Sequence, residues 1–382
     1  MKCLRFASSL VLELCRRLAI DKSKAVHLGS AIGDGRVRCR GVLRPIQIAG
    51  GGLAGLTLGI LLRRKEIPVE IWEAGSYPRH RVCGEFVSGR GLALLAEWGL
   101  VEHLPGCWMN SVRLISENGA TNQMALPDRA WSVSRYSLDH ALATCFVEAG
   151  GQLFQNRRWT EEFREGVVRA TGRRLKKASD GKTYNGFKVH ARNLAPSTDL
   201  ELHFSASGYV GVSRLPDGEA NICGIFRAKG NFKDTRSAHR DFFERVLFGR
   251  TKTEFSKAAL NEKSFCGVAG ISLERASATE ANECRIGDSI CMIPPFTGNG
   301  MSLALESAQI AAPLLVGYAR GDLEWRAVRR KISQTCHSAF RRRLWFSSIL
   351  QKLAVSPHYR GLILSSFKTF PKLLELCFRV TR

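Results

Sequence analysis

The segment Ile46-Gln47-Ile48-Ala49-Gly50-Gly51-Gly52-Leu53-Ala54-Gly55 decides the fold class of this 382-residue chain. A short apolar run stops at three consecutive glycines, and apolar residues then recur at helical spacing as far as Leu62. This pattern predicts a strand, a tight turn and a helix. A second apolar run, Ile67 to Glu73, ends on an acid and predicts the next strand, which completes a β-α-β unit.

Gly50, Gly52 and Gly55 form a G-x-G-x-x-G pattern between the expected strand and the expected helix. The first glycine permits the tight turn, the second lets a pyrophosphate approach the backbone, and the third lets the helix pack close to the strand. The helix N-terminus offers N–H groups and partial positive charge to phosphates. Glu73 stands where a carboxylate would bind ribose hydroxyls and repel a 2′-phosphate. The segment therefore predicts a site for FAD or NAD rather than NADP.

A second strand-turn-helix pattern lies far downstream. Glu283 to Ile286 predicts a strand, Gly287-Asp288 follows it, and Pro294 to Gly300 leads into a helix from about Met301 to Leu315. An aspartate at the strand end can bind ribityl hydroxyls, and a glycine-rich helix start can place N–H donors near a flavin pyrimidine. This second segment favours FAD over NAD.

The remaining segments indicate a second unit that is rich in strands. Asp217-Gly218 between two apolar runs is a hairpin signal. The expected helices are Gly91 to Trp98, Leu138 to Val147 and Asp241 to Ala259, and the expected strands are Val112 to Ile115, Phe187 to Ala191, Leu200 to Phe204, Tyr209 to Leu215 and Ala220 to Phe226.

The composition is that of a folded and strongly basic protein. Hydrophobic residues make up 45% of the chain, which excludes wholesale disorder. The 57 Lys and Arg residues exceed the 34 Asp and Glu residues by 23, and such an excess attracts phosphates, acidic lipids or nucleic acid. Because zinc-finger spacing and aromatic RNA-binding signatures are missing from the sequence, we expect no nucleic-acid partner. The 12 cysteines contain no C-x-x-C pair, which favours a reducing compartment, the cytoplasm, over a metal site.

Residues 1–41 open with a short apolar run that Glu13, Arg16 and Arg17 interrupt, and no small-residue cleavage site follows it. We therefore expect an N-terminal extension or surface helix rather than a signal peptide. We expect no membrane-spanning segment, because no stretch reaches the roughly 18 apolar residues needed to span a bilayer.

Further motifs join the two glycine-rich segments, and together they resemble the geranylgeranyl reductase family. That family belongs to the wider class of flavoproteins that share the p-hydroxybenzoate hydroxylase fold. The resemblance runs from about Pro45 to Leu315. The residues that carry it are Gly50-x-Gly52-x-x-Gly55, Glu73, Tyr77-Pro78-Arg79-His80-Arg81-Val82-Cys83-Gly84-Glu85, Arg135-x-x-Leu138-Asp139, Gly287-Asp288 and Pro294 to Gly300.

The resemblance implies an α/β fold with a Rossmann-type FAD-binding domain, an inserted and mostly antiparallel substrate sheet, and a C-terminal helical tail. The FAD-binding domain is expected to be discontinuous. The expected boundaries are 42–104, 132–175 and 277–322 for the FAD-binding domain, 105–131 and 176–276 for the substrate domain, and 323–382 for the basic tail.

The resemblance also implies the site residues. Cys83 and Tyr209 are the candidates for direct action on the substrate, and no metal ligand is expected. In the reductases a cysteine like Cys83 lies near the flavin, and its alternative here is a small buried side chain at a tight turn. The residues expected to contact FAD are Gly50, Gly52, Leu53, Ala54, Gly55, Glu73, Ala74, Cys83, Gly84, Arg135, Gly287, Asp288, Pro295, Gly298, Asn299, Gly300 and Met301.

Two segments depart from the family pattern. In the substrate-sheet motif, Tyr209 to Pro216, only the tyrosine and the proline remain, while Gly211 and Leu215 stand where bulk is expected. The pocket is therefore expected to be reshaped. At Ala170-Thr171-Gly172-Arg173 the wider class carries Ala-Asp-Gly, and the missing aspartate weakens an inference of nicotinamide binding from that segment.

The pattern leaves three functions open. The first is an FAD-dependent reductase that takes electrons from NAD(P)H and reduces a C=C bond of a lipid, isoprenoid or polyketide-like substrate. The second is an FAD-dependent monooxygenase acting on an aromatic or polyketide-like substrate, and the third is a flavin-binding protein without turnover. The Trp-x-Trp-x-Ile-Pro motif of related halogenases is missing.

The C-terminal tail combines basic and apolar residues. Arg341, Arg342 and Arg343 are followed directly by Leu344 and Trp345. Such a segment can lie on an anionic membrane without spanning it, which would suit an apolar substrate. The alternative is a solvated face on a helix that packs against the body of the protein.

Overall fold

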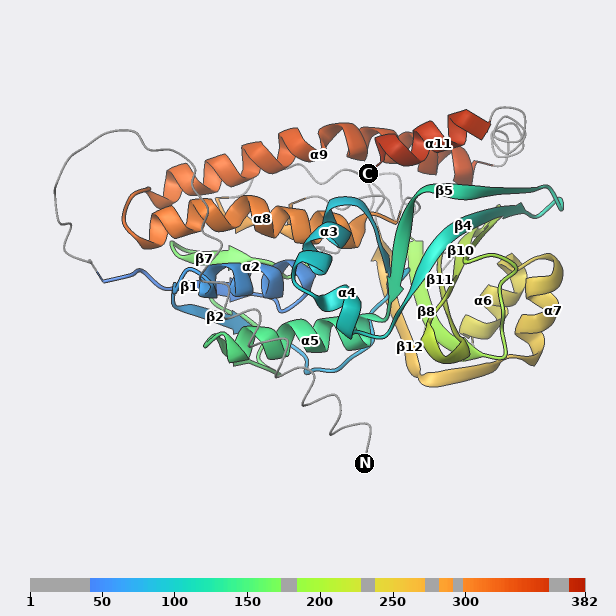
Figure 1. Ribbon diagram of the computed structural model, residues 1–382, viewed down its shortest axis with the longest axis horizontal. Coiled ribbons are helices and arrows are strands. Elements are labelled where there is room, and N and C mark those ends of the chain that lie inside the picture. The colour runs from blue at the N-terminus through green and yellow to red at the C-terminus, as the bar shows by residue number, and fades with distance from the viewer. Residues whose placement is uncertain are drawn as a thin grey trace.

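The computed structural model describes residues 42–172, 184–227, 238–271, 282–290, 298–356 and 371–381. These residues form a parallel β-sheet, a second sheet that is almost entirely antiparallel, and a row of long helices beside the parallel sheet (Figure 1). The expectations for residues 1–41 and for Pro294 to Thr297 lie outside the described residues.

The parallel sheet has five strands in the order β13-β7-β1-β2-β6, and every neighbouring pair is parallel. It assembles segments that are far apart in the sequence. Ile46 and Ile48 of the central strand are fully buried, as expected for a strand that is covered on both faces. The strands are β1 (Ile46–Ala49), β2 (Val69–Trp72), β6 (Gln152–Phe154), β7 (Val167–Arg169) and β13 (Cys284–Arg285).

Four long helices run beside this sheet (Figure 1). Helix α2 packs against α5 and α8, and α8 packs in turn against α9. The helix bounds are α2 (Leu53–Arg63), α3 (Gly89–Glu97), α4 (Leu100–His103), α5 (Arg135–Glu148), α8 (Gly300–Ala319), α9 (Trp325–Val355) and α11 (Pro371–Val380).

The glycine turn between β1 and α2 has the geometry that the sequence predicts. Gly50 has φ +111°, a backbone conformation that side chains with a Cβ rarely adopt. A Cβ on Gly55 would collide with the carbonyl oxygen of Gly50, so the helix lies too close to the strand for any other residue. At Gly52 nothing lies within 4 Å of the Cβ position, so the backbone is open there.

The second sheet has eight strands in the order β12-β8-β11-β10-β9-β4-β5-β3, antiparallel throughout except for the pair of β4 with β9. A turn at Pro216–Gly218 joins β10 to β11, which confirms the predicted hairpin. The strands are β3 (Phe86–Val87), β4 (Gly106–Ser116), β5 (Thr121–Val133), β8 (Tyr184–Arg192), β9 (Leu200–Ser205), β10 (Gly208–Arg214), β11 (Glu219–Arg227) and β12 (Ala259–Ile271).

This sheet has two different faces because successive side chains of a strand point to opposite sides. One face packs against α6 and α7 through a core that includes Phe187, Val210 and Phe226. On the other face, one residue from each of five neighbouring strands stands in register. Those residues are Leu202, Gly211, Cys223, Lys188 and Cys266.

The structure corrects the expected helix from Asp241 to Ala259. Two helices are present, α6 (Ala238–Val246) and α7 (Gly249–Lys257), and the chain breaks between them where Gly249 adopts φ +60°. The expected helix also ends early, because β12 begins at Ala259. The long strands β5 and β12 were missed because their exposed, polar positions hide the alternation on the buried side.

Helix α8 corrects the expectation that no segment is long and apolar enough to cross a membrane. Among the described residues this one helix passes that test by length and composition, with a mean hydropathy of 1.2. Its 18-residue window is 56% buried inside the structure, and the helix packs against α2, α3 and α9. A helix enclosed by its own fold meets the same criteria as a membrane span, and α8 is such a core helix.

We predict that Gly55→Val lowers the stability of the protein by about 1–3 kcal/mol, because the added side chain must push α2 away from the turn at Gly50. Gly52→Ala is the matched control in the same turn, and its free energy of unfolding should stay within roughly 0.5 kcal/mol of the wild type. Urea unfolding followed by circular dichroism measures both. Equal stability of the two variants would contradict the close packing of α2 on β1.

Candidate functional site

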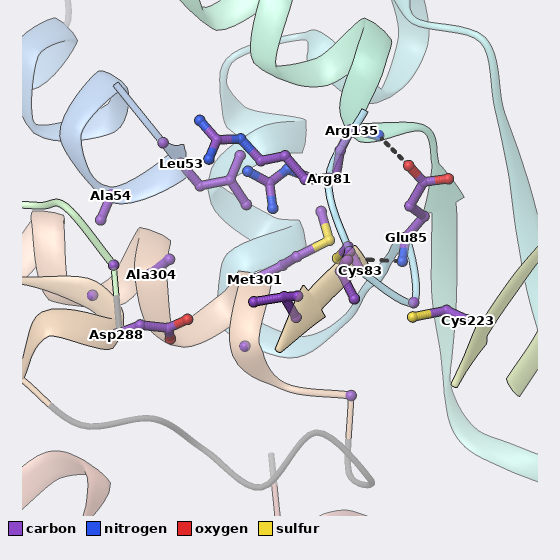
Figure 2. A pocket seen from close by; sticks show the side chains of 18 of the residues that line it. Leu53, Ala54, Arg81, Cys83, Glu85, Arg135, Cys223, Asp288, Met301 and Ala304 are labelled. Atoms are coloured by element: carbon purple, nitrogen blue, oxygen red, sulfur yellow. Dashed lines mark hydrogen bonds between the residues drawn. The ribbon is translucent and has the colours of Figure 1, made fainter. Parts of the chain in front are cut away.

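A cavity of about 940 Å³ lies between the parallel sheet and the second sheet. The turn before α2, the turn before α8 and the inner face of the second sheet all line it (Figure 2). Gly52 and Gly298 thus share one continuous space although they are far apart in the sequence. The predicted site residues that line it are Gly50, Gly52, Leu53, Ala54, Glu73, Ala74, Cys83, Gly84, Arg135, Tyr209, Gly287, Asp288, Gly298, Gly300 and Met301.

Two predicted contact residues lie behind the cavity wall. Gly55 is buried against Gly50, so its contribution is to helix packing. Asn299 is buried and donates its side-chain amide to the carbonyl oxygen of Thr381, which ties the start of α8 to the end of α11. Pro295 lies outside the described residues.

Glu73 is already held by several donors. Its carboxylate accepts hydrogen bonds from the N–H groups of Gly51 and Gly75, both at 2.9 Å, and pairs with Arg79 at 2.6 Å and Arg81 at 3.3 Å. Burial raises the pKa of Glu73, but Arg81 and the other donors outweigh it and hold the pKa below its usual value. The sequence argument against a 2′-phosphate considered only the negative charge of the Glu73 carboxylate. With two guanidinium groups beside it, charge at this position does not by itself exclude NADP.

An aromatic group that the sequence reasoning missed lines the cavity beyond Glu73. The ring of Trp72 lies 4.5 Å from that of Phe154 and 5.7 Å from that of Trp159, and the Arg169 guanidinium lies 3.5 Å above the ring of Phe163. The indole nitrogens of Trp72 and Trp159 are buried and have no hydrogen-bond partner among the described residues. Buried donors of this kind ordinarily find an acceptor, and flat bases stack on such rings.

Arg135 is fixed by a buried carboxylate. It donates to both oxygens of Asp139, at 2.6 and 2.8 Å, and Arg81 donates to the same carboxylate at 3.1 Å. Asp139 has no exposed surface, and two-point pairing of this kind holds a guanidinium plane rigidly. Arg135 also lies close to Cys83, whose pKa is raised by burial more than the guanidinium lowers it. Cys83 therefore stands in the cavity as a protonated thiol.

Glu85 lies at the centre of a buried cluster that no motif predicted. Its carboxylate accepts from Nε2 of His190 at 2.6 Å, Nζ of Lys188 at 3.1 Å and the N–H of Arg135 at 2.9 Å, where α5 begins. Burial raises the pKa of Glu85, but His190, Lys188 and the Arg135 N–H outweigh it, so the pKa is lowered. Glu85 itself adopts φ +56°, which is unfavourable for a residue with a side chain and marks a locally constrained position.

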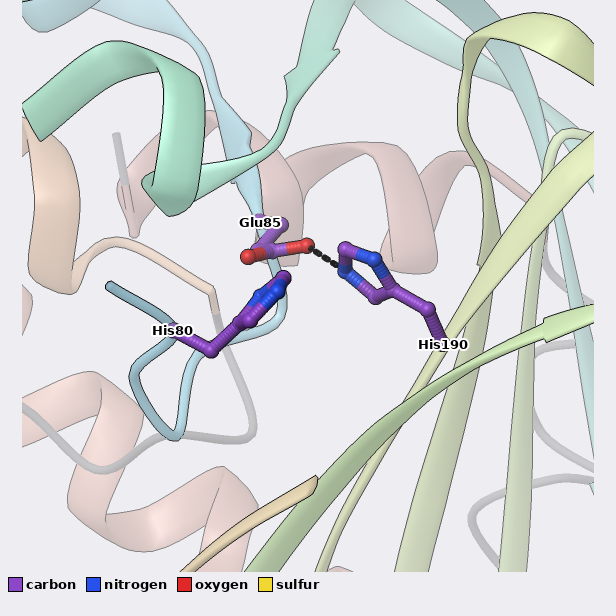
Figure 3. Close-up of side chains that lie close together, drawn as sticks. All are labelled: His80, Glu85 and His190. Carbon is purple, nitrogen blue, oxygen red and sulfur yellow. Dashed lines mark hydrogen bonds and ion pairs between the residues drawn. The ribbon is translucent and has the colours of Figure 1, made fainter. Parts of the chain in front are cut away.

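His80, Glu85 and His190 offer ligand atoms within 4.8 Å of one another, which is a geometry that could hold a metal ion (Figure 3). The Lys188 ammonium, which is fully buried, already lies 2.9 Å from Nδ1 of His80 and 3.1 Å from Glu85. A buried cation thus neutralises the carboxylate without any metal. We propose no metal ion at this cluster.

The chain around Cys83 is pinned to the second sheet. The side-chain amide of Asn221 donates to the carbonyl oxygen of Cys83 at 3.1 Å, and the hydroxyl of Ser213 donates to that of Gly84 at 3.2 Å. With Lys188 and His190 on Glu85, three neighbouring strands hold this one segment. Short polar side chains on β10 and β11 gave no sequence signal, because such residues are common on any sheet surface.

The part of the cavity beside β9, β10 and β11 is apolar. Tyr209 is 7% exposed and forms part of its wall, and Gly211 leaves a hollow between Leu202 and Cys223 where a larger residue would fill the space. The predicted reshaping of the pocket at Gly211 therefore has a structural basis. The other apolar residues that line this part are Phe86, Leu114, Ile225, Val268, Ile271, Leu350 and Phe378.

Comparison with known proteins identifies the fold. The sequence matches no protein-family model and no curated protein. The flavin-dependent brominase Bmp2 superposes with a TM-score of 0.69 at 16% identity over 88% of this chain and 92% of Bmp2. PqsL, a probable FAD-dependent monooxygenase from Pseudomonas aeruginosa, gives 0.63 at 16% identity over 84% and 99%. A flavoprotein/dehydrogenase from Cytophaga hutchinsonii gives 0.65 at 14% identity over 86% and 94%.

The chain therefore has the fold of flavin-dependent monooxygenases and halogenases, which confirms the predicted fold class. The comparison supports the fold of the wider class named in the sequence analysis. It does not single out the geranylgeranyl reductases within it.

We predict that Lys188→Met destabilises the protein by about 3–5 kcal/mol, because it leaves the Glu85 carboxylate buried with one cation fewer. The double variant Lys188→Met/Glu85→Gln should recover much of that loss. Chemical unfolding of both variants and the wild type measures it. Because the pKa of Glu85 is lowered in the folded state, the loss should be full above the ordinary value of 4.5 and should shrink as the pH falls below it. A pH-independent loss would contradict the ionic account.

Proposed function

We propose that the chain is an FAD-dependent oxidoreductase and, within that class, a monooxygenase. The observation that carries the proposal is the single cavity that runs from the aromatic group at Trp72, past both glycine turns, to the apolar face of the second sheet. A cavity of about 940 Å³ lies in the range of cofactor and ligand sites, which is roughly 300–1,000 Å³.

The residues present fit FAD. The open backbone at Gly52 and the N-terminus of α2 suit the pyrophosphate. The indole N–H groups of Trp72 and Trp159, which have no partner among the described residues, suit the adenine end. Asp288 suits the ribityl hydroxyls, and the start of α8 near Gly300 suits the flavin pyrimidine. A bound flavin supplies two-electron chemistry and reaction with oxygen, and the protein orients it and excludes water.

The monooxygenase proposal is supported by the fold of PqsL and by the apolar substrate side of the cavity. We propose an apolar aromatic or polyketide-like substrate, with NAD(P)H as the reductant. The sequence lacks the halogenase motif, so halogenation is not proposed although two kinds of halogenase share the fold.

A reductase that acts on a C=C bond is the second candidate, and the position of Cys83 in the cavity favours it. A reductase must supply a proton as well as a hydride to the double bond. The Cys83 thiol, whose pKa burial raises, keeps its proton and is available for that role. The third alternative, a flavin-binding protein without turnover, has no such observation in its favour.

The first test is loading with FAD and supply of labelled oxygen. We expect a yellow protein that releases FAD on heating, loses its colour with NADH or NADPH, and incorporates one labelled oxygen atom into a compound from a panel of apolar aromatic and polyketide-like probes. Gly52→Val should abolish FAD binding, because its side chain would occupy the backbone approach. Anaerobic reduction of a C=C bond by the reduced protein would support the reductase instead, and loading without any turnover would support the scaffold.

We also propose that the protein works in the cytoplasm at the surface of anionic membranes. Helix α9 carries eight basic residues and no acidic one: Arg326, Arg329, Arg330, Lys331, Arg341, Arg342, Arg343 and Lys352. Arg343 pairs with Glu306 at 2.8 Å, but Arg341 and Arg342 are exposed and have no ion pair among the described residues. Trp345 beside them is 56% exposed. A basic surface with an exposed tryptophan suits a lipid head-group region.

We predict co-sedimentation with phosphatidylserine vesicles that weakens as salt rises, since the Debye length falls to about 3 Å at 1 M. Arg341→Gln/Arg342→Gln should reduce binding severalfold. The matched control removes two charges from α7, by Lys252→Gln/Lys257→Gln, and should change vesicle binding little. Equal binding to phosphatidylcholine vesicles would contradict the electrostatic account.

A further inference from the structure

Five titratable side chains form a series that runs from the start of β11, an interior strand of the second sheet, to the cavity. Nδ1 of His190 lies 3.5 Å from a carboxylate oxygen of Glu219, and its Nε2 lies 2.6 Å from Glu85. Glu85 lies 3.1 Å from Nζ of Lys188, which lies 2.9 Å from Nδ1 of His80. Three of these contacts have hydrogen-bond distances, and the contact of His190 with Glu219 lies at the outer limit, so these two side chains must approach each other for a transfer.

The two ends of this series of side chains have different surroundings. The Glu219 side chain is 21% exposed and is not part of the cavity lining, whereas His80 and Glu85 line the cavity. The middle members are enclosed: Lys188 and Glu85 have no exposed surface, and the His190 side chain is 4% exposed. The series of side chains thus crosses a region that excludes water, and it connects solvent to the cavity.

The donors and acceptors are arranged in a consistent direction. Lys188 has only donors, so its contact with Nδ1 of His80 requires a lone pair there and leaves the proton of a neutral His80 on Nε2. Burial and the Lys188 charge lower the pKa of His80 to about 4, which agrees with a neutral ring near pH 7. His80 stacks on Tyr136 at 4.7 Å, which fixes the plane of the ring.

Other charged or titratable groups also face these five side chains. They come from the segment before β3, from α5 and from strands β8, β11 and β12: Arg81, Arg135, Arg192, Cys83, Cys223 and Cys266. The cysteines keep their protons, because burial raises the pKa of each thiol. Arg192 pairs with Glu219 at 3.1 Å at the exposed end of the series.

We propose that Glu219, His190, Glu85, Lys188 and His80 form a proton relay between solvent and the cavity. The proposal rests on the proposed flavin function, because reduction of FAD to FADH₂ by a hydride requires one further proton. In one passage Glu219 takes a proton from water and passes it to Nδ1 of His190, whose Nε2 proton goes to Glu85. Glu85 returns to its anion by protonating Lys188 as Lys188 protonates His80.

His80 then releases its Nε2 proton into the cavity. Each member has gained one proton and lost one, so one proton has moved from solvent to the cavity and no charge has changed. Both imidazoles are then left in the Nδ1–H form, and they regain the Nε2–H form when a proton runs back along the same residues to solvent on reoxidation of the flavin. His80 and Glu85 are the members that line the cavity, Glu219 and His190 act through Glu85, and Lys188 joins Glu85 to His80.

The test is electrode-driven reduction of the FAD-loaded protein, in which the electrode supplies the electrons and proton delivery limits fast reduction. We expect Glu219→Gln to slow this reduction roughly tenfold or more and to increase the slowing in D₂O, because the relay loses its solvent end. His80→Ala should do the same, and imidazole in millimolar amounts should restore its rate. Glu148→Gln, an exposed carboxylate on α5, is the matched control and should leave the rate unchanged.

A wild-type rate and isotope effect in Glu219→Gln would overturn the relay, since Glu219 does not touch the cavity and can act only through its neighbours. Failure to bind FAD would instead count against the proposed function. A second measurement needs no flavin: ¹⁵N NMR of the histidines should show His80 in the Nε2–H form near pH 7. A protonated His80, or the Nδ1–H form, would also overturn the relay.

Discussion

The interaction on which the site depends is the buried contact of the Glu85 carboxylate with strand β8 and with the start of α5. Lys188 and His190 approach it from the second sheet, and the Arg135 N–H approaches it from the helix beside the parallel sheet. A buried carboxylate is tolerated only where enough donors replace water. The two sheets must therefore keep the relative position that brings these donors together, and that position leaves the cavity between them.

The cavity between the two sheets has a polar end and an apolar end. Toward the parallel sheet lie paired ions and, beyond Glu73, two indole N–H groups without a partner in the described part of the chain, which suits a polar cofactor with phosphates. Toward β9 and β10 the wall is apolar and hollow at Gly211, which suits a substrate that avoids water. Between the two ends stands the Cys83-Gly84-Glu85 segment, which the second sheet holds through Asn221 and Ser213. The reacting groups would meet at that segment.

The sequence predicted those parts of the site that depend on backbone shape. Gly50 adopts φ +111° and Gly55 packs on its carbonyl, so local geometry alone required glycine at both positions. Lys188, His190 and Glu219 escaped prediction because a lysine or histidine in a strand usually faces solvent. The importance of Lys188 and His190 comes from a partner, Glu85, that lies about a hundred residues earlier in the chain, and Glu219 contacts His190 in turn. The enclosure of α8 escaped prediction for the same reason, because neighbours outside the segment decide it.

By itself the sequence determined that a parallel α/β unit begins at Ile46, that glycines form its first turn, and that a hairpin-rich sheet follows. Those properties are local, since spacing of apolar residues and the position of glycines govern them. Only the tertiary structure decided that the turns at Gly52 and Gly298 share one cavity, that Arg79 and Arg81 neutralise Glu73, and that buried ionisable side chains connect that cavity to solvent. These properties arise from contacts between distant segments, and the energy of a buried charge depends on every group that surrounds it.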